Sequence, residues 1–340
     1  MMSGTNEAPS APHGIVLFWY HASPYGRRIK AYLTLRDIAH AECIQPPILP
    51  RPDLDALGVK YRRSPVMAIG RDLYLDTRLM ISKLEELFPA SSEHPGLSSP
   101  GTNGLAQLLQ KLSVDGSMFQ HAVRQIPRDS ALMKSPAFQK DRAGFFGPQW
   151  DLEDARLWRP EAIIQMQQCF DIIESLLADG RNWVAGTETI SLADLEGVWV
   201  LNWFLNDLNP TEGYFSEDRY PKVHAWVRRY RNELDVAKAR VRKSISLGGA
   251  NAVKSIVLSD FTDQDTLVDE RDPLQLKAGV EVDLFPTDGG GFTHQDRGRL
   301  VKLTKEEVAI AVQAQTGEEI RIHAPRWQFR VRAINNAARL

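Results

Sequence analysis

The sequence has little cysteine, no long apolar run and no large excess of either charge. Its 340 residues include two cysteines, Cys43 and Cys169, which excludes a disulfide-rich scaffold and indicates a reducing compartment. No apolar run approaches the roughly 20 residues needed to span a bilayer. A net charge of −2 gives no reason to expect nucleic acid or an acidic membrane as a partner. We therefore expect a cytoplasmic protein with neither kind of partner.

The composition is that of an ordinary globular chain. Hydrophobic residues make up 43% and charged residues 25% of the sequence, and a chain of this length is expected to form two or three domains. Residues 1–14 lack the basic and then apolar layout of a secretion signal, so we interpret them as a lead-in to the first domain.

The N-terminal part is organised around a strand that runs into a helix. Residues 14–20 form a continuous apolar run, typical of a strand buried on both faces. Ser23 then provides a favourable N-cap, and Pro24 suits the first helical position. The Ser23 hydroxyl would lie beside free backbone N–H groups and the positive end of the helix dipole, which favour an anion. From these residues alone, Ser23 either only caps the helix or contributes to an anion site.

The following residues predict the rest of a small α/β domain. Residues 40–44 favour a short strand, and the four prolines of residues 45–52 exclude a helix there. A strand entered through Pro65 and a strand at residues 73–75 are predicted to form an antiparallel hairpin around Gly70. Asp76 and Thr77 open a periodic helix that Pro89 ends. The predicted order is βαβ, a loop and ββα.

This order, with three motifs at its joints, resembles the thioredoxin-like N-terminal domain of the cytosolic glutathione transferases. The motifs are Ala22-Ser23-Pro24-Tyr25, Ser64-Pro65-Val66 and Asp76-Thr77. Each motif alone is weak, but their order and spacing are specific, and the serine in the first motif resembles the serine-type members, such as the tau, omega and zeta-like classes. The resemblance implies glutathione as the cofactor, no metal, and a homodimer.

The resemblance also implies a role for each motif. Ser23 would be catalytic, and Ser23 and Tyr25 would contact glutathione. Pro65 would follow a cis peptide bond, so that Ser64 offers its backbone to the cysteinyl part of glutathione. Asp76 and Thr77 would hold the γ-glutamyl group.

The chemistry of the thiol is consistent with this assignment. A free cysteine thiol has a pKa of about 8.5, and a hydroxyl that donates a hydrogen bond to sulfur at a helix N-terminus favours the thiolate. Ser23 would then activate the sulfur of glutathione. Tyr20 and His21 are the neighbouring alternatives. Arg51, in the proline-rich loop, is a candidate partner for the glycyl carboxylate, although a solvated surface arginine fits its position equally well.

The remaining sequence predicts two further domains. Residues 14–89 form the thioredoxin-like domain, residues 90–104 are a Ser/Pro/Gly-rich linker, and residues 105–243 are helical. Ser191 and Asp194 form a capping box there, which we interpret as structural. Alternating runs at residues 280–284, 308–312, 320–323 and 327–331 suggest a small SH3-like β-barrel over residues 250–334. The predicted fold class is thus a thioredoxin-like α/β domain, an all-α glutathione transferase C-terminal domain and an all-β extension.

These features together predict a glutathione transferase. The activated thiolate would attack an electrophilic, fairly apolar small molecule. A glutathione-dependent isomerase or eliminase is the enzymatic alternative, in which glutathione is regenerated. A non-catalytic binding or assembly protein that acts through its β extension is the other alternative.

Overall fold

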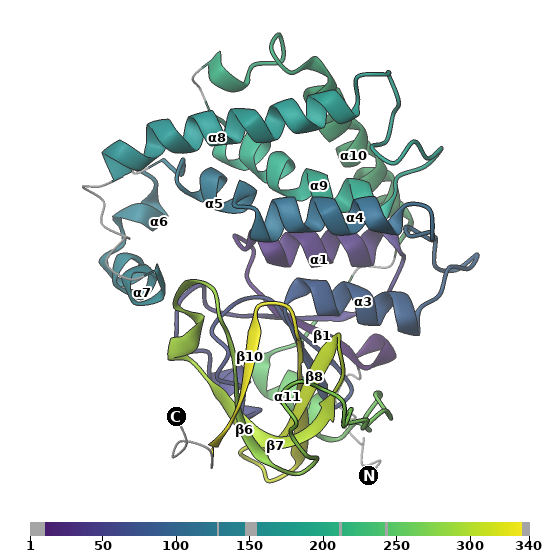
Figure 1. Cartoon of the computed structure of the whole chain (residues 1–340), viewed down its shortest axis with the longest axis vertical. Coiled ribbons are helices and arrows are strands. Elements are labelled where there is room, and N and C mark those ends of the chain that lie inside the picture. Colours follow the sequence, from purple (N-terminus) through teal and green to yellow (C-terminus); the bar gives the residue numbers. More distant parts are fainter. Residues whose placement is uncertain (1–10, 128, 147–154, 211–212, 242–243, 335–340) are drawn as a thin grey trace, which may run out of the picture. The chain divides into compact units, whose positions relative to one another are not determined.

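The computed structural model describes residues 11–127, 129–146, 155–210, 213–241 and 244–334 (Figure 1). The chain forms two compact units. The first unit comprises residues 1–29, 39–87 and 243–340, and the second comprises residues 30–38 and 88–242. Both ends of the chain therefore contribute to one unit. No helix in the described ranges has the length and apolar character needed to cross a membrane.

The N-terminal part of the first unit has the predicted thioredoxin-like order, except that a short helix, Pro52–Ala56, occupies part of the predicted loop. Strand β1 pairs in parallel with β2 and antiparallel with β3, and β3 pairs antiparallel with β4. Every residue of β1, β3 and β4 is buried, which explains why β1 and β3 are continuous apolar runs and why Asp72 is the one charged residue among the three strands. The elements are β1 (Ile15–Trp19), α1 (Pro24–Leu35), β2 (Ala41–Ile44), α2 (Pro52–Ala56), β3 (Val66–Ile69), β4 (Asp72–Leu75) and α3 (Thr77–Leu87).

The C-terminal residues form the strands of the predicted β region, but these strands belong to one open ten-stranded sheet and not to a separate SH3-like barrel. Five strands follow the order β10-β6-β7-β8-β9, so that the last strand returns to pair with the first. They are β6 (Glu281–Pro286), β7 (Asp296–Leu303), β8 (Glu307–Gln313), β9 (Glu319–Pro325) and β10 (Phe329–Ala333). Strand β7 was not among the runs identified from sequence, because its first inward positions are Asp296 and Gly298 in place of apolar residues.

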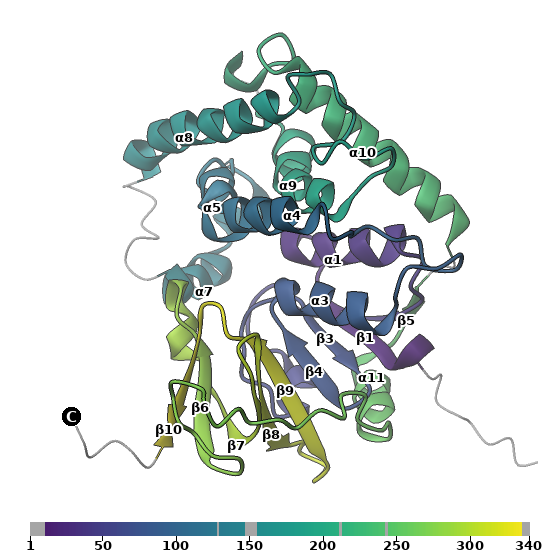
Figure 2. The ribbon, with the colours of Figure 1, turned by 45° about the vertical axis from the view of Figure 1, so that its right-hand side comes forward.

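The two sheet regions are continuous. Strand β9 pairs in parallel with β4, with Leu73 opposite Ile322 and Tyr74 opposite His323, giving a ten-stranded sheet of order β10-β6-β7-β8-β9-β4-β3-β1-β2-β5. Figure 2 shows β9 beside β4 within this unit. At the other edge, β5 (Ile245–Ser246) pairs with β2 and is followed by α11 (Gly249–Val257). The sequence predicted a β extension but not this pairing.

Buried charges hold β9 against β4. The imidazole of His323 bonds through Nδ1 to Glu307 Oε1 at 2.6 Å and through Nε2 to Asp72 Oδ1 at 2.9 Å. Burial lowers the pKa of His323, but its hydrogen bonds to the two carboxylates outweigh burial and raise the pKa. Lys83 and Lys302 each lie within 3.3 Å of the carboxylates of Asp263 and Glu307. Charges of both signs are therefore paired at this junction.

The second unit is helical. Its elements are α4 (Asn103–Gln110), a π-helical turn (Lys111–Asp115), α5 (Met118–Val123), α6 (Ala131–Lys134), α7 (Pro136–Phe146), α8 (Ala155–Leu176), α9 (Leu192–Trp203), a second π-helical turn (Phe204–Leu208) and α10 (Pro221–Arg240). Helix α9 is buried along ten of its twelve residues, as expected for a helix that is apolar nearly all round.

The predicted capping box is present at the start of α9. Asp194 Oδ2 accepts hydrogen bonds from Ser191 N at 3.0 Å and Ser191 Oγ at 2.6 Å. Asp194 Oδ1 accepts from Val184 N at 2.9 Å and from Trp226 Nε1 at 2.8 Å. The fully buried carboxylate thus joins the start of α9 to the preceding loop and to α10, which is a structural role.

Candidate functional site

The register of the sheet brings the three predicted motifs to one place. Phe18 on β1 lies opposite Val66 on β3, and Val66 lies opposite Leu75 on β4. Each motif begins within a few residues of this row: Ser23 beyond the end of β1, Ser64 and Pro65 before β3, and Asp76 after β4. The motifs therefore gather at the same end of the sheet, within the first unit.

Ser23 is the N-cap of α1. Its Oγ accepts a hydrogen bond from Gly26 N at 3.0 Å, and only 2% of the residue is exposed. A hydroxyl that accepts an N–H keeps its own hydrogen available for donation. Capping and donation to a ligand are therefore compatible at Ser23.

Asp76 lies between β4 and α3 in a strained backbone conformation. Its φ is +66°, in the left-handed region that aspartate enters more readily than most residues. Asp76 Oδ1 accepts from the backbone N and from Nε of Arg78, both at 2.9 Å, and Oδ2 accepts from Arg78 Nη2 at 2.7 Å. Burial raises the pKa of Asp76, but the charge and hydrogen bonds of Arg78 hold it below its usual value. A carboxylate offers about four acceptor positions, so this one can accept a further donor.

Thr77 opens α3 and is tied to α1. Arg28, which is 1% exposed, donates from Nη1 to Thr77 Oγ1 at 2.5 Å. The first N–H groups of a helix have no intrahelical acceptor and carry a partial positive charge. The N-termini of α1 and α3 therefore both contribute positive potential to this end of the sheet.

Ser64 and Pro65 form a cis peptide bond, as the resemblance implied. Ser64 Oγ is buried and has no hydrogen-bond partner among the described residues. A buried hydroxyl that is not satisfied is uncommon in folded proteins. It provides an unused polar group directly before β3.

Tyr25 lies among charged groups that the sequence did not identify. It is half-buried, and burial together with the charge of Asp76 raises the pKa of its phenol, although Arg28, Arg63 and Arg78 act in the opposite direction. Tyr25 therefore stays protonated near neutral pH. Three guanidinium groups face two carboxylates, Asp76 and the Arg63 partner Asp288, and the one remaining positive charge favours an anionic ligand.

Two of these three arginines, Arg28 and Arg78, could have been recognised from the sequence pattern. Arg28 lies at helical spacing from Tyr25 and Tyr32, on the side of α1 that carries apolar residues, where an arginine is unusual. Arg78 directly follows the Asp76-Thr77 motif. The charge partner of Arg63 lies 225 residues away at Asp288, and no local pattern reveals such a pair.

Arg51 has structural contacts. Its buried guanidinium donates from Nη1 to the carbonyls of Arg62 at 2.6 Å and Arg63 at 3.0 Å, and from Nε to the carbonyl of Pro46 at 3.2 Å. These contacts do not support the solvated surface arginine, and they favour a role in holding the chain before Pro65 over direct contact with a ligand carboxylate.

The two alternatives to Ser23 are placed differently. The ring of Tyr20 lies 5.9 Å from the Arg51 guanidinium carbon. The side chain of His21 is exposed and stacks edge-on against Trp19 at 5.3 Å. Neither residue lies at the first turn of α1, where Ser23 does.

Neither protein thiol competes as a nucleophile. Burial, with the nearby charge of Asp53, raises the pKa of Cys43 to about 12, and burial raises that of Cys169 to about 11. The thiol form therefore dominates for both cysteines at neutral pH.

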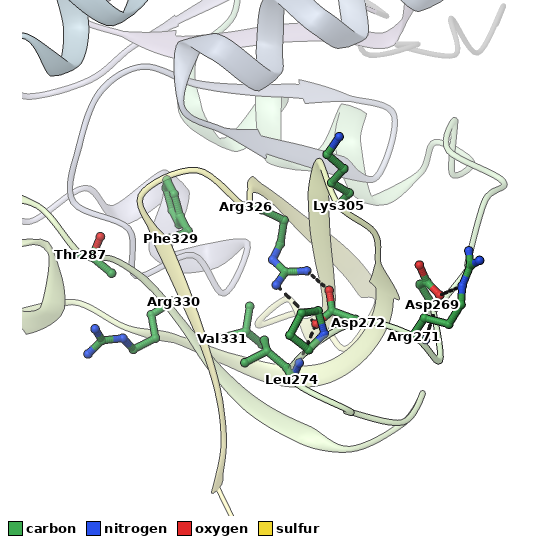
Figure 3. A pocket seen from close by; sticks show the side chains of 11 residues that line it. Asp269, Arg271, Asp272, Leu274, Thr287, Lys305, Arg326, Phe329, Arg330 and Val331 are labelled. Carbon is green, nitrogen blue, oxygen red and sulfur yellow. Dashed lines mark hydrogen bonds and ion pairs between the residues drawn. The ribbon is translucent and has the colours of Figure 1, made fainter.

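A cavity of about 480 Å³ lies in the C-terminal β region (Figure 3). Its apolar wall includes Leu274, Phe329 and Val331, and its charged rim includes Arg271 and Lys305. None of the predicted glutathione residues lines it. Close by, ligand atoms of Asp263, Glu307 and His323 lie within 4.8 Å of one another, but the ammonium groups of Lys83 and Lys302 already neutralise the carboxylates.

Parts of this chain match known protein families. Residues 17–92 match the family model for the glutathione S-transferase N-terminal domain. Residues 17–92 are therefore a glutathione S-transferase N-terminal domain. Residues 121–239 match a second family model, described as a domain of unknown function (DUF7962). No curated protein matched the sequence.

Two solved structures show the extent of the shared fold. A GST-like protein from Pseudomonas syringae is 24% identical, with a TM-score of 0.69 over 94% of this chain and 99% of that chain. The β-etherase LigF from Sphingobium sp. strain SYK-6 is 13% identical, with a TM-score of 0.52 over 67% of this chain and 99% of that chain. A third of the present chain thus has no counterpart in the β-etherase, whereas the first protein matches nearly all of it.

Proposed function

We propose that this protein is a glutathione-dependent transferase of the serine type. The observation that carries the proposal is the row of Phe18, Val66 and Leu75, since it brings the Ser23, Pro65 and Asp76 motifs together. The glutathione S-transferase N-terminal domain at residues 17–92 and the excess of guanidinium groups at this end of the sheet support it.

The γ-glutamyl end of glutathione fits the start of α3. Asp76 Oδ2 accepts from Arg78 Nη2, and its second lone pair would accept an N–H from the ammonium. The γ-glutamyl carboxylate would bind at the N-terminus of α3 and to the hydroxyl of Thr77, beside the charge of Arg28. The backbone of Ser64 would form hydrogen bonds with the cysteinyl residue of glutathione. The phenol of Tyr25 would donate a hydrogen bond to glutathione.

Ser23 would stabilise the thiolate. The Gly26 N–H already polarises its oxygen, which strengthens the hydroxyl as a donor to sulfur. The thiol proton leaves to solvent, and a sulfur lone pair then forms a bond to the electrophilic carbon. In a substitution, the leaving group departs with the electron pair of its own bond. In an addition, the electron pair of the attacked double bond takes up a proton from solvent.

The test compares two helices that begin with the same dipeptide. Ser135 and Pro136 open α7 as Ser23 and Pro24 open α1, and Ser135 Oγ accepts from Phe138 N at 3.4 Å. Reduced glutathione would be titrated calorimetrically into the wild type, Ser23→Ala and Ser135→Ala, and the thiolate followed by its ultraviolet absorbance near neutral pH. We expect the wild type and Ser135→Ala to bind glutathione as thiolate, and Ser23→Ala to bind it mainly as thiol.

Either of two results would contradict the proposal. Absence of binding to the folded wild type removes the glutathione site. Equal thiolate absorbance in Ser23→Ala and the wild type removes Ser23 as the activating group, and Tyr20→Phe and His21→Ala would then be measured in the same way.

The β-etherase LigF is named for action on ether bonds, which favours elimination or ether cleavage as the alternative reaction. Product analysis separates the cases, because conjugation incorporates glutathione and isomerisation regenerates it. A non-catalytic scaffold is the second candidate, favoured by the cavity in the C-terminal β region. Absence of turnover across electrophiles despite glutathione binding would support the scaffold. The cytoplasmic location and the homodimer remain predictions, and sedimentation velocity would test the latter.

A further inference from the structure

The segment before Pro65 has no helix or strand of its own. Residues 57–65 are irregular in the structure, so their backbone groups depend on partners elsewhere. The carbonyls of Arg62 and Arg63 accept from Arg51. Further contacts come from the C-terminal β region, from β7, β10 and the connection between β6 and β7, more than 200 residues away in sequence.

Asp288, Asp296 and Phe329, all in the C-terminal part of the chain, contact this segment. Asp296, at the start of β7, is 1% exposed and accepts from Lys60 N at 2.6 Å, and the backbone of Tyr61 also bonds to it. Phe329, at the start of β10, stacks on the ring of Tyr61 with a centroid separation of 6.1 Å and an angle of 27°. The three contacts are independent in chemistry, since one is a carboxylate cap, one is aromatic and one is an ion pair.

The ion pair lies closest to the cis peptide bond. Arg63 donates from Nη1 to Asp288 Oδ2 at 3.1 Å and from Nη2 to Asp288 Oδ1 at 3.0 Å, and also to the Asp288 carbonyl. Such paired donation fixes the plane of a guanidinium group. Arg63 therefore has a fixed direction one residue before Ser64.

We infer that the C-terminal β region positions the Ser64-Pro65 backbone for glutathione, with Asp288, Asp296 and Phe329 as positioning residues. This inference rests on the proposed function for its ligand, but the ordering of the segment can be measured without any ligand. The C-terminal β region then stabilises one part of the proposed glutathione site. This role also accounts for the direct contacts between sequence segments at opposite ends of the chain.

The experiment uses the full chain and changes only the Arg63–Asp288 ion pair. Asp288→Ala removes the partner of Arg63, and Asp288→Glu restores the charge. Glu319→Ala is the matched control, because it breaks the Arg299–Glu319 pair at 2.8 Å, which has similar exposure on the acidic side but no contact with residues 57–65. The readouts are amide hydrogen exchange of residues 57–65, calorimetric affinity for reduced glutathione, and KM against kcat for an electrophile that is turned over.

We expect Asp288→Ala to speed exchange in residues 57–65 and to weaken glutathione affinity about threefold to tenfold, which is the scale of one partly exposed ion pair. KM for glutathione should rise more than kcat falls, and Asp288→Glu should recover most of the affinity. Glu319→Ala should match the wild type in all readouts except overall stability.

The outcomes separate this inference from the proposed function. Unchanged exchange in Asp288→Ala, or glutathione affinity equal to or tighter than that of the wild type, overturns the positioning role while leaving the site in place. A wild type that does not bind glutathione overturns the proposed function, and faster exchange in Asp288→Ala would then still confirm that Asp288 orders the segment.

Discussion

The structure contains two buried aspartates beside helix N-termini that differ in how they are satisfied. Asp194 at the start of α9 accepts four hydrogen bonds, all from neutral groups. Asp76 before α3 accepts three, two of them from the guanidinium of Arg78, and has a positive φ. One carboxylate is saturated and joins three segments, whereas the other is charged, strained and able to accept one more donor.

The two environments shift the pKa values in opposite directions. Burial raises the pKa of Asp194, and its hydrogen bonds offset this only in part. Burial acts in the same direction on Asp76, but the charge and hydrogen bonds of Arg78 prevail and lower the pKa. Asp194 therefore has a saturated shell of neutral donors, whereas Asp76 keeps an acceptor position that the proposed glutathione site would use.

The largest expected effect is on the stability of the helical unit. Asp194→Ala leaves the buried donors of Val184, Ser191 and Trp226 without their acceptor, and we expect a loss of about 3 to 5 kcal/mol in the free energy of unfolding. Urea denaturation monitored by circular dichroism measures it. Asp179→Ala, which breaks the exposed pair with Arg181 in the same unit, should cause a much smaller loss, because exposed ion pairs contribute little to stability. Similar losses of unfolding free energy in Asp194→Ala and Asp179→Ala would show that the buried capping box stabilises the unit no more than an exposed ion pair does.

The next effect separates binding from stability. Asp76→Asn keeps a residue that tolerates the left-handed conformation but removes the charge that would meet the glutathione ammonium. We expect glutathione affinity to fall about 10-fold to 100-fold, the scale of one charge-assisted hydrogen bond, while the free energy of unfolding falls by less than in Asp194→Ala. Calorimetry and urea denaturation of the same preparations measure both. Wild-type affinity in Asp76→Asn would remove Asp76 from the glutathione site.

The smallest effect concerns pH. An unfolded aspartate titrates near pH 3.9. Because the pKa of Asp76 is lowered on folding, its charge stabilises the fold above that pH, and this contribution is lost as pH falls through the folded pKa. Because the pKa of Asp194 is raised, ionisation penalises the fold increasingly as pH rises from about 3.9 through its folded pKa.

Urea titrations between pH 3 and pH 7 measure the two trends. The stability advantage of the wild type over Asp76→Asn should grow with rising pH, whereas its advantage over Asp194→Asn should shrink. Slopes of the same sign for the two variants would contradict the assigned environments.

Local patterns predicted most of the site because they mark joints between elements. The N-cap at Ser23, the proline before β3 and the pair that opens α3 are short-range signals. The roles of Arg28 and Arg63 depend on partners 49 and 225 residues away, and Arg51 was interpreted without knowledge of the carbonyls that it meets. Charged side chains follow no period, so their partners depend on the completed fold.

The same distinction applies to the fold. Apolar alternation predicted β6, β8, β9 and β10, but the inward Asp296 concealed β7. Periodicity predicts which face of a strand is buried and carries no information on which strand lies beside it. The β4–β9 pairing, which joins two segments separated by a whole helical unit, was therefore outside the reach of sequence patterns.

This pairing also fixes an order of events during synthesis. Strand β4 emerges from the ribosome about 240 residues before β9, a delay of roughly 10 to 50 seconds at ordinary elongation rates. During this interval the thioredoxin-like strands lack the neighbour that covers their outer edge, and an uncovered edge is a template for pairing with other chains. Strand β4 is therefore synthesised early but is covered only after β9 has been made. A chain that stops short of β9 keeps β4 as an exposed edge strand that can pair with other chains.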